Sequence, residues 1–203
     1  MGIMPRRWAL TAILLSSALA VTASGCVSGR YPGERRSLFD CGELEGVFSN
    51  AGRNAKSAEP GLSPRRYTPF LASLFDASGE TADLDAQSEL SVAIRHIGGG
   101  RLRFAILDRQ GNIRESGTHQ YFESCRKGVL ERVWTESLNT GEGWLGTDEK
   151  RTDTLFVNAE GSLVLTAKGT AAGLFLGFPI VGGSAEWREF SPDGRFNIDD
   201  VDF

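Results

Sequence analysis

Hydrophobic residues alternate with polar ones through much of the second half of the chain. From Leu90 to Ile94 every second residue is apolar, and the same spacing returns between Leu102 and Ile106. Three consecutive glycines at 98–100 separate the two runs. A two-residue period interrupted by a glycine turn predicts a β-hairpin with one buried face.

Similar segments, joined by short turns, follow one another along the rest of the chain. Outside this hairpin, we expect strands at 44–49, 112–124, 129–138, 152–157, 163–168 and 184–190. A Gly-rich stretch at 139–150 is expected to be a loop. Consecutive hairpins favour an antiparallel meander. The predicted fold class is therefore all-β, mostly antiparallel, with seven or eight short strands in a barrel or half-barrel.

One segment has helical spacing instead. Thr68 can cap a helix that begins at Pro69, and apolar residues follow at positions 70, 71, 74 and 75. This pattern predicts one short helix near residues 69–77. Since no long helices alternate with the strands, a parallel α/β sheet is not expected.

The segment Gly169–Gly183 is apolar without alternation and contains no charged residue. Its large apolar side chains are Leu174, Phe175, Leu176, Phe178, Ile180 and Val181. A strand buried on both faces has this pattern, so we favour a segment that crosses the core. Two alternatives remain open: an apolar contact with a bilayer or a lipid ligand, and a contact between subunits.

The first 25 residues have the pattern of a signal peptide. Arg6 and Arg7 precede 14 uncharged, mainly apolar residues, Trp8–Val21, which are too few to span a bilayer. Small residues follow and end at Cys26. Residues 26–40 show no apolar period and are expected to be a tether, which leaves 41–203 as a single β-rich periplasmic domain.

The residues Ala23-Ser24-Gly25-Cys26 resemble the bacterial lipobox, although Ala23 stands where leucine is preferred. The resemblance implies cleavage before Cys26 and attachment of diacylglycerol to its sulfur, with palmitate as a typical acyl chain. Two or three acyl chains hold a protein firmly on a membrane. Plain cleavage that leaves a free thiol is the alternative. Val27 in place of aspartate favours the outer membrane, with the domain facing the periplasm.

The cysteine count agrees with an oxidising compartment. If Cys26 is acylated, Cys41 and Cys125 remain as a pair, for which we predict a disulfide. Two buried thiols, or bonds to other chains, are the alternatives. No Cys-x-x-Cys motif is present, so neither a redox motif nor a zinc knuckle is indicated.

Charge and motifs argue against several function classes. After Cys26 the chain has 20 basic and 26 acidic residues, a net charge of −6, so no nucleic-acid partner is expected. The two histidines, His96 and His119, lack metal-ligand spacing, and no nucleophile or phosphate-binding motif occurs. Oxygen-bearing side chains between Asp193 and Asp200 lack EF-hand spacing. We therefore expect no enzyme activity, no cofactor and no metal.

Two short motifs resemble a known group. Cys41-x-x-Leu44-x-Gly46-x-Phe48, together with Trp187-Arg188-x-Phe190 near the end, is similar to the pattern in small proteobacterial lipoproteins. Its central part faintly resembles the opening strand of lipocalins, where Trp is favoured at the position of Phe48. The resemblance carries no function with it. Our first hypothesis is a lipid-anchored envelope lipoprotein, a structural or interaction module with the membrane and an envelope protein as partners. The lipocalin likeness suggests only a small β-barrel. The alternative hypothesis is a lipocalin-like carrier of a lipid or another apolar ligand.

Overall fold

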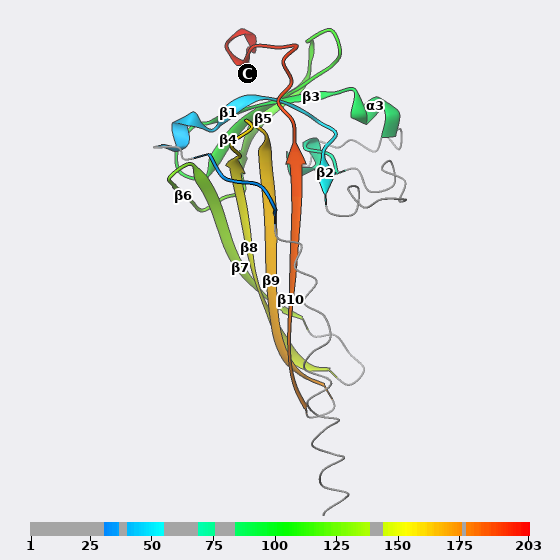
Figure 1. Cartoon of the computed structure of the whole chain (residues 1–203), viewed down its shortest axis with the longest axis vertical. Coiled ribbons are helices and arrows are strands. Elements are labelled where there is room, and N and C mark those ends of the chain that lie inside the picture. Colours follow the sequence, from blue (N-terminus) through cyan, green and yellow to red (C-terminus); the bar gives the residue numbers. More distant parts are fainter. Residues whose placement is uncertain (1–30, 37–39, 55–68, 76–83, 139–143, 176–177) are drawn as a thin grey trace, which may run out of the picture.

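Two antiparallel sheets form the framework of the molecule (Figure 1). The computed structural model describes residues 31–36, 40–54, 69–75, 84–138, 144–175 and 178–203. The four-stranded sheet has the order β1 (Glu45–Ser49), β3 (Ser91–His96), β4 (Arg101–Leu107) and β5 (Ile113–Gln120). The six-stranded sheet has the order β2 (Arg53–Asn54), β10 (Phe178–Phe190), β9 (Leu163–Phe175), β8 (Trp144–Val157), β7 (Val129–Leu138) and β6 (Ser124–Arg126).

The predicted all-β antiparallel class is confirmed, and the two sheets correspond to its half-barrel form. The hairpin of β3 and β4 has the expected register, with Val92 opposite Ile106 and His96 opposite Leu102. The described chain has ten strands instead of seven or eight, because the predicted strand 112–124 is divided into β5 and β6 and because the short β2 is added.

The two sheets are continuous in sequence at both edges. Strand β1 leads through residues 50–52 into β2, and β5 leads through residues 121–123 into β6, so the chain bends from one sheet to the other twice. The glycine turn between β3 and β4 lies against the second bend: a Cβ on Gly100 would stand 1.7 Å from the carbonyl oxygen of Phe122. The missing side chain at position 100 therefore allows this corner to close.

The main core lies between the sheets. Strands β1, β3, β4, β7, β8, β9 and β10 contribute to it. Its members include the buried side chains Phe48, Val92, Ile94, Leu102, Phe104, Ile106, Leu130, Leu155, Leu163 and Phe190. Phe122, at the bend after β5, is also buried in this cluster. Complete burial of one such side chain stabilises a fold by about 1.5–3 kcal/mol.

A smaller apolar cluster covers the outer face of the four-stranded sheet. Val47, Ala93, Ala105 and Leu107 are buried there, and the C-terminal segment packs on them through Phe196, Ile198, Val201 and Phe203. The segment includes a 3-10 helix, η3 (Ile198–Asp200). Its apolar residues explain why the chain beyond the last strand is held against the domain.

The helical content is small. The predicted helix near 69–77 is a 3-10 helix, η2 (Ala72–Phe75), and residues 76 and 77 lie outside the described chain. The amide of Ala72 donates to the Asn50 side chain at 2.7 Å. A five-residue helix, α3 (Leu84–Ser88), and the 3-10 helix η1 (Cys41–Glu43) were not predicted from the sequence. Such short helices persist only because they pack on the sheets.

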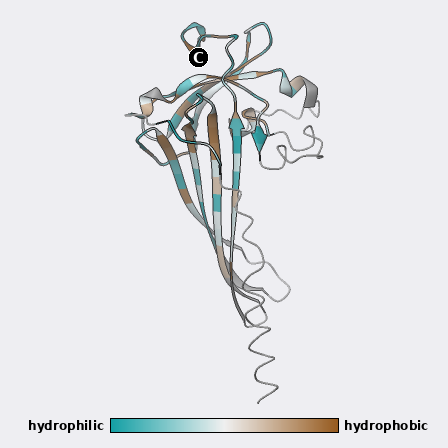
Figure 2. Cartoon of the chain, viewed as in Figure 1, coloured by the Kyte–Doolittle hydropathy of each residue, from teal (hydrophilic) through white to brown (hydrophobic). Residues whose placement is uncertain are grey.

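Strands β7 to β10 extend well beyond the core and form a long, twisted ribbon (Figure 1). We call its outlying part (residues 132–138, 144–153, 167–175 and 178–186) the stalk and the two-sheet part the head. Figure 2 shows hydrophobic residues where these strands enter the head and more hydrophilic ones along the stalk. The prediction of a loop at 139–150 is wrong from Trp144 onward, because β8 pairs with β9 there, which adds a ladder that the sequence pattern does not reveal.

The prediction that Gly169–Gly183 crosses the core is also wrong. The segment forms the outer end of the β9–β10 hairpin, at the far end of the stalk (Figure 1), with Phe178 opposite Phe175. The side chain of Val181 is 81% exposed. Among the described residues, this end of the hairpin pairs only with β8, through β9, and it belongs to neither core cluster.

Candidate functional site

The structure confirms the predicted disulfide between Cys41 and Cys125. It does not test the predicted lipidation site. Cys26 and Leu176 lie outside the described residues. The disulfide joins η1, at the start of the head, to β6 at the edge of the six-stranded sheet, with 6.2 Å between the Cα atoms. It therefore links the beginning of the domain to the corner where β5 turns into β6.

The other predicted contact residues gather at the end of the stalk. In the backbone register Pro179 lies opposite Leu174, Ile180 opposite Gly173, and Val181 opposite Ala172. Strand β8 adds two further apolar positions, with Trp144 opposite Phe175 and Leu145 opposite Leu174. We call these residues (144, 145, 174, 175 and 178–181) the tip. The sequence pattern does not predict that Trp144 and Leu145 join them.

A polar cavity, absent from the sequence-based expectations, opens on the inner face of the ribbon just below the core. Leu130 and Leu155 belong to the core, and residues two positions further along each strand share their face. The register places Arg132 opposite Asp153, and Trp134 opposite Arg151. The inner face thus changes from aliphatic to charged and aromatic within one residue pair.

Aromatic and cationic side chains interleave in this cavity. The Arg132 guanidinium lies 4.5 Å from the ring centre of Tyr121 and 5.6 Å from that of Trp134, and the Arg151 guanidinium lies 5.3 Å from Trp134 on the other strand. The Tyr121 hydroxyl donates to an Asp153 oxygen at 2.5 Å. Burial raises the pKa of Tyr121, and the hydrogen bond to Asp153 raises it further, so this hydroxyl stays protonated at neutral pH.

Two buried donors in this region have no hydrogen-bond acceptor among the described residues. They are the indole Nε1 of Trp134 and the Nε of Arg151, whose nearest carboxylate oxygen, on Glu149, is 3.9 Å away. Arg132, Arg188 and His119 line the adjoining cavity, whose volume is about 610 Å³. Trp134 and Arg151 line a smaller space of about 130 Å³ beside it. The guanidinium groups of the larger cavity suit a polar group that accepts hydrogen bonds better than an acyl chain.

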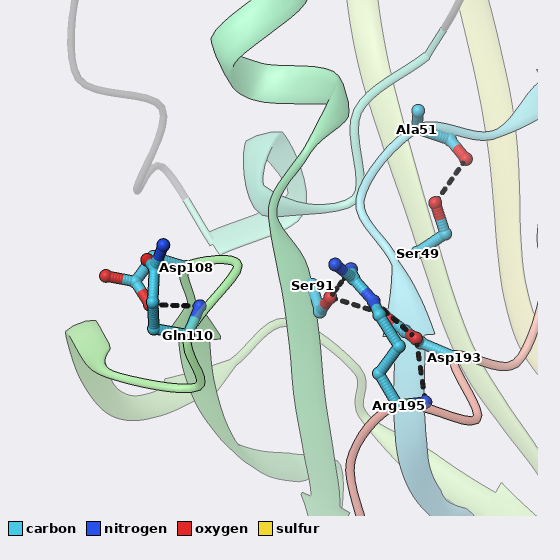
Figure 3. A network of polar contacts seen from close by, with 7 residues as sticks. All are labelled: Ser49, Ala51, Ser91, Asp108, Gln110, Asp193 and Arg195. Atoms are coloured by element: carbon cyan, nitrogen blue, oxygen red, sulfur yellow. Dashed lines mark hydrogen bonds and ion pairs between the residues drawn. The ribbon is translucent and has the colours of Figure 1, made fainter.

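The acidic residues near the C-terminus form a structural contact with the head. Asp193 makes a two-point ion pair with Arg195, at 3.0 Å and 2.7 Å, and also accepts a hydrogen bond from the buried Ser91 hydroxyl (Figure 3). In the same view Asp108 accepts from the Gln110 amide at 2.9 Å within a turn. Among the described residues, no group of three or more His, Cys, Asp or Glu side chains is arranged to hold a metal ion.

Replacing Asp193 by asparagine should destabilise the protein at neutral pH but not at low pH. The hydrogen bonds from Arg195 and Ser91 lower the pKa of Asp193 to about 2. Its unfolded-state pKa is about 3.9, so the carboxylate stabilises the fold above pH 4 and loses this effect as the pH falls toward 2. Urea unfolding should show a loss of about 2 kcal/mol at pH 7 and almost none at pH 2.

The control for this prediction is Asp202→Asn, at an exposed position of the same C-terminal segment. It should change the free energy of unfolding little at either pH. Equal losses at pH 7 and pH 2 for Asp193→Asn would show that packing, and not the charge, accounts for the effect.

Residues 31–36, which belong to the predicted tether, pack on the outer face of the ribbon. The Arg36 amide donates to the Val157 carbonyl at 3.1 Å, and the Ala159 amide donates to the Glu34 carbonyl at 3.1 Å. The Tyr31 ring stands edge-on to Phe156 and Trp187, at 5.9 Å and 5.6 Å between centres. Part of the expected tether is therefore held by the domain.

A buried polar pair fixes the end of this segment. The Asn158 amide group donates to the Tyr31 hydroxyl at 2.6 Å and to Glu189 at 3.2 Å. Glu189 is almost completely buried and is also paired with Arg53 at 2.9 Å. The hydrogen bonds and the aromatic contacts give residues 31–36 a defined place on β8 and β10.

None of the helices within the described ranges is long and apolar enough to cross a membrane. Comparison with protein-family models, with curated proteins and with solved structures finds no match to the chain.

Proposed function

We propose that the protein is a lipid-anchored lipoprotein of the bacterial envelope, acylated at Cys26, and that it acts as an interaction module held at the outer membrane. The observation that carries this proposal is the docking of residues 31–36 on the six-stranded sheet. The acylated residue would lie only five positions before the docked Tyr31. Such a short connection would hold the domain close to the bilayer and restrict its orientation.

The disulfide and the cavity support the same proposal. A disulfide between Cys41 and Cys125 suits an exported protein in an oxidising compartment. The polar cavity offers a binding surface with guanidinium donors from Arg132 and Arg188. A role as carrier of an apolar ligand receives less support, since this cavity is lined by arginines and the interior nearer the head is filled by the core.

Lipid attachment can be tested on the full chain expressed in a Gram-negative host. We expect the mature protein to begin at Cys26, to carry a diacylglyceryl group in its mass spectrum, and to partition into the detergent-rich phase of Triton X-114. Cys26→Ala should abolish the added mass. The matched control, Cys41→Ala with Cys125→Ala, should retain it. A mature chain with an unmodified thiol at Cys26 would refute the proposal.

A further inference from the structure

The residues at the outer end of the stalk are mainly apolar, and they lie far from the head. The tip brings together eight positions of three strands, and none of them carries a charge. It lies at the opposite end of the molecule from the C-terminus (Figure 1). Val181 is one of two large hydrophobic side chains that are strongly exposed among the described residues. An uncharged cluster with an exposed apolar side chain of this kind usually marks a contact surface.

The charged residues begin at the inner row of the tip, because Asp148 and Val181 both pair with Ala172. On β8 the acidic pair Asp148 and Glu149 and then Lys150 lie opposite Ala172, Ala171 and Thr170 of β9. The exposed Lys168 follows further toward the head. Strands β9 and β10 themselves have no charge between Lys168 and Glu186, so β8 sets the limit. Outside the row of Asp148 the hairpin has three charge-free pairs, 173–175 with 178–180, which cover about 10 Å.

The position of Tyr31 limits how far the bilayer can be from the domain. Tyr31 lies five positions after Cys26, and a fully extended chain of this length spans at most about 18 Å. Tyr31 packs against Trp187, which lies nine positions after Phe178, the outer end of β10. At about 3.3 Å per residue, the hairpin reaches about 30 Å beyond that contact.

The reach of the hairpin exceeds the reach of the extended tether by about 12 Å, which is close to the length of the three charge-free rows. If the stalk points toward the membrane that holds the acyl chains, the short tether brings the bilayer surface to the boundary between the tip and the charged residues. In Figure 1 residues 31–36 descend from the head toward the stalk, which is the direction that this arrangement requires.

We propose that the tip inserts into the bilayer leaflet that holds the lipid of Cys26, so that the protein is attached to one membrane at two points. This inference rests on the proposed lipid anchor. The occupant of the apolar tip is the lipid bilayer, and Trp144 and the phenylalanines at 175 and 178 supply the aromatic residues that favour the membrane interface. The charged positions 148–150 limit the depth of insertion, because they would be costly to move into hydrocarbon.

A fluorescent probe at the tip tests this arrangement. In the acylated full chain, Cys41 and Cys125 are bonded to each other and Cys26 is blocked by lipid, so Val181→Cys provides a single reactive thiol. It is labelled with the polarity-sensitive dye NBD, and the protein is reconstituted into vesicles of phosphatidylethanolamine and phosphatidylglycerol. The matched control is Ile113→Cys, at the other exposed large hydrophobic residue, on β5 of the head.

We expect the NBD emission at position 181 to shift to shorter wavelength on reconstitution and to be quenched by doxyl-labelled lipids, while the label at position 113 shows neither effect. Circular dichroism of both labelled proteins checks that the fold is retained. A second variant, Val181→Asp with the label at position 178 in place of phenylalanine, should reduce the lipid quenching, because a carboxylate opposes insertion.

Three results would overturn the inference. A label at position 181 that remains as accessible to water as the one at 113, on protein that still floats with the vesicles, would show that the tip stays outside while the lipid anchor holds. Quenching at both positions would show that the domain lies flat on the membrane. A blue shift without lipid quenching would show that a protein surface, such as a second copy, covers the tip. The mass at Cys26 separately tests the proposed anchor.

Discussion

Replacing both Cys41 and Cys125 by alanine should lower the free energy of unfolding by about 4.5 kcal/mol, the largest loss that we expect from any of the proposed substitutions. The bond closes a loop with a sequence separation of 84, so it removes many conformations from the unfolded chain. Cys41 is also 4% exposed and belongs to the buried set, so reduction would leave the fold without its link between η1 and β6. Urea unfolding of the oxidised wild type and the double variant measures the difference.

The wild type in the presence of a strong reductant is the control for this prediction. It should unfold at nearly the same urea concentration as the double variant, because both lack the covalent link. An unchanged midpoint in the double variant would mean that the unfolded chain is already restricted, so that the disulfide adds little stability.

Gly100→Ala should destabilise the head by about 3 kcal/mol, or prevent the corner between β5 and β6 from closing. The added Cβ would lie 1.7 Å from the Phe122 oxygen and 2.2 Å from its carbonyl carbon. Both are backbone atoms, so a rotamer change cannot relieve the clash. Because Phe122 is fully buried in the main core, moving its backbone would also disturb the packing between the sheets. Thermal and urea unfolding of the variant provide the measurement.

Gly99→Asn is the matched control in the same turn. Gly99 has a φ of +61°, a conformation that asparagine tolerates, and a Cβ added at this position would meet nothing within 4 Å. Its cost should stay below about 1 kcal/mol. Equal losses for the two variants would show that the turn conformation, and not the contact with Phe122, accounts for the sensitivity of this site.

Local patterns were sufficient to predict most of the head. The alternation around Val92 and Phe104 identified both the strands and their buried faces, because an antiparallel sheet with one covered face requires that period. The even number of cysteines after Cys26 identified the pair that the structure joins. The helical spacing after Pro69 located η2, although only one 3-10 turn forms among the described residues there.

The stalk could not be predicted in this way. An apolar run without alternation is compatible with a strand buried on both faces or with one that has no opposing layer, and the sequence does not distinguish the two. The partners that extend β8 back to Trp144 lie on β7 and β9, so its length depends on pairings distant in sequence. The same pairings bring Arg132, Trp134 and Arg151 to one side of the ribbon and create the polar cavity.

The sequence by itself determined the all-β class, the faces of the strands in the head and the cysteine pair, because each depends on local spacing or on residue count. Lipid attachment at Cys26, which depends on a short motif, stays a prediction. Only the tertiary structure decided that residues 31–36 dock on the outer face, that the apolar run ends a projecting hairpin, and that a charged cavity opens below the core. These features depend on which strands pair and on how far each ladder extends, and long-range contacts alone settle both.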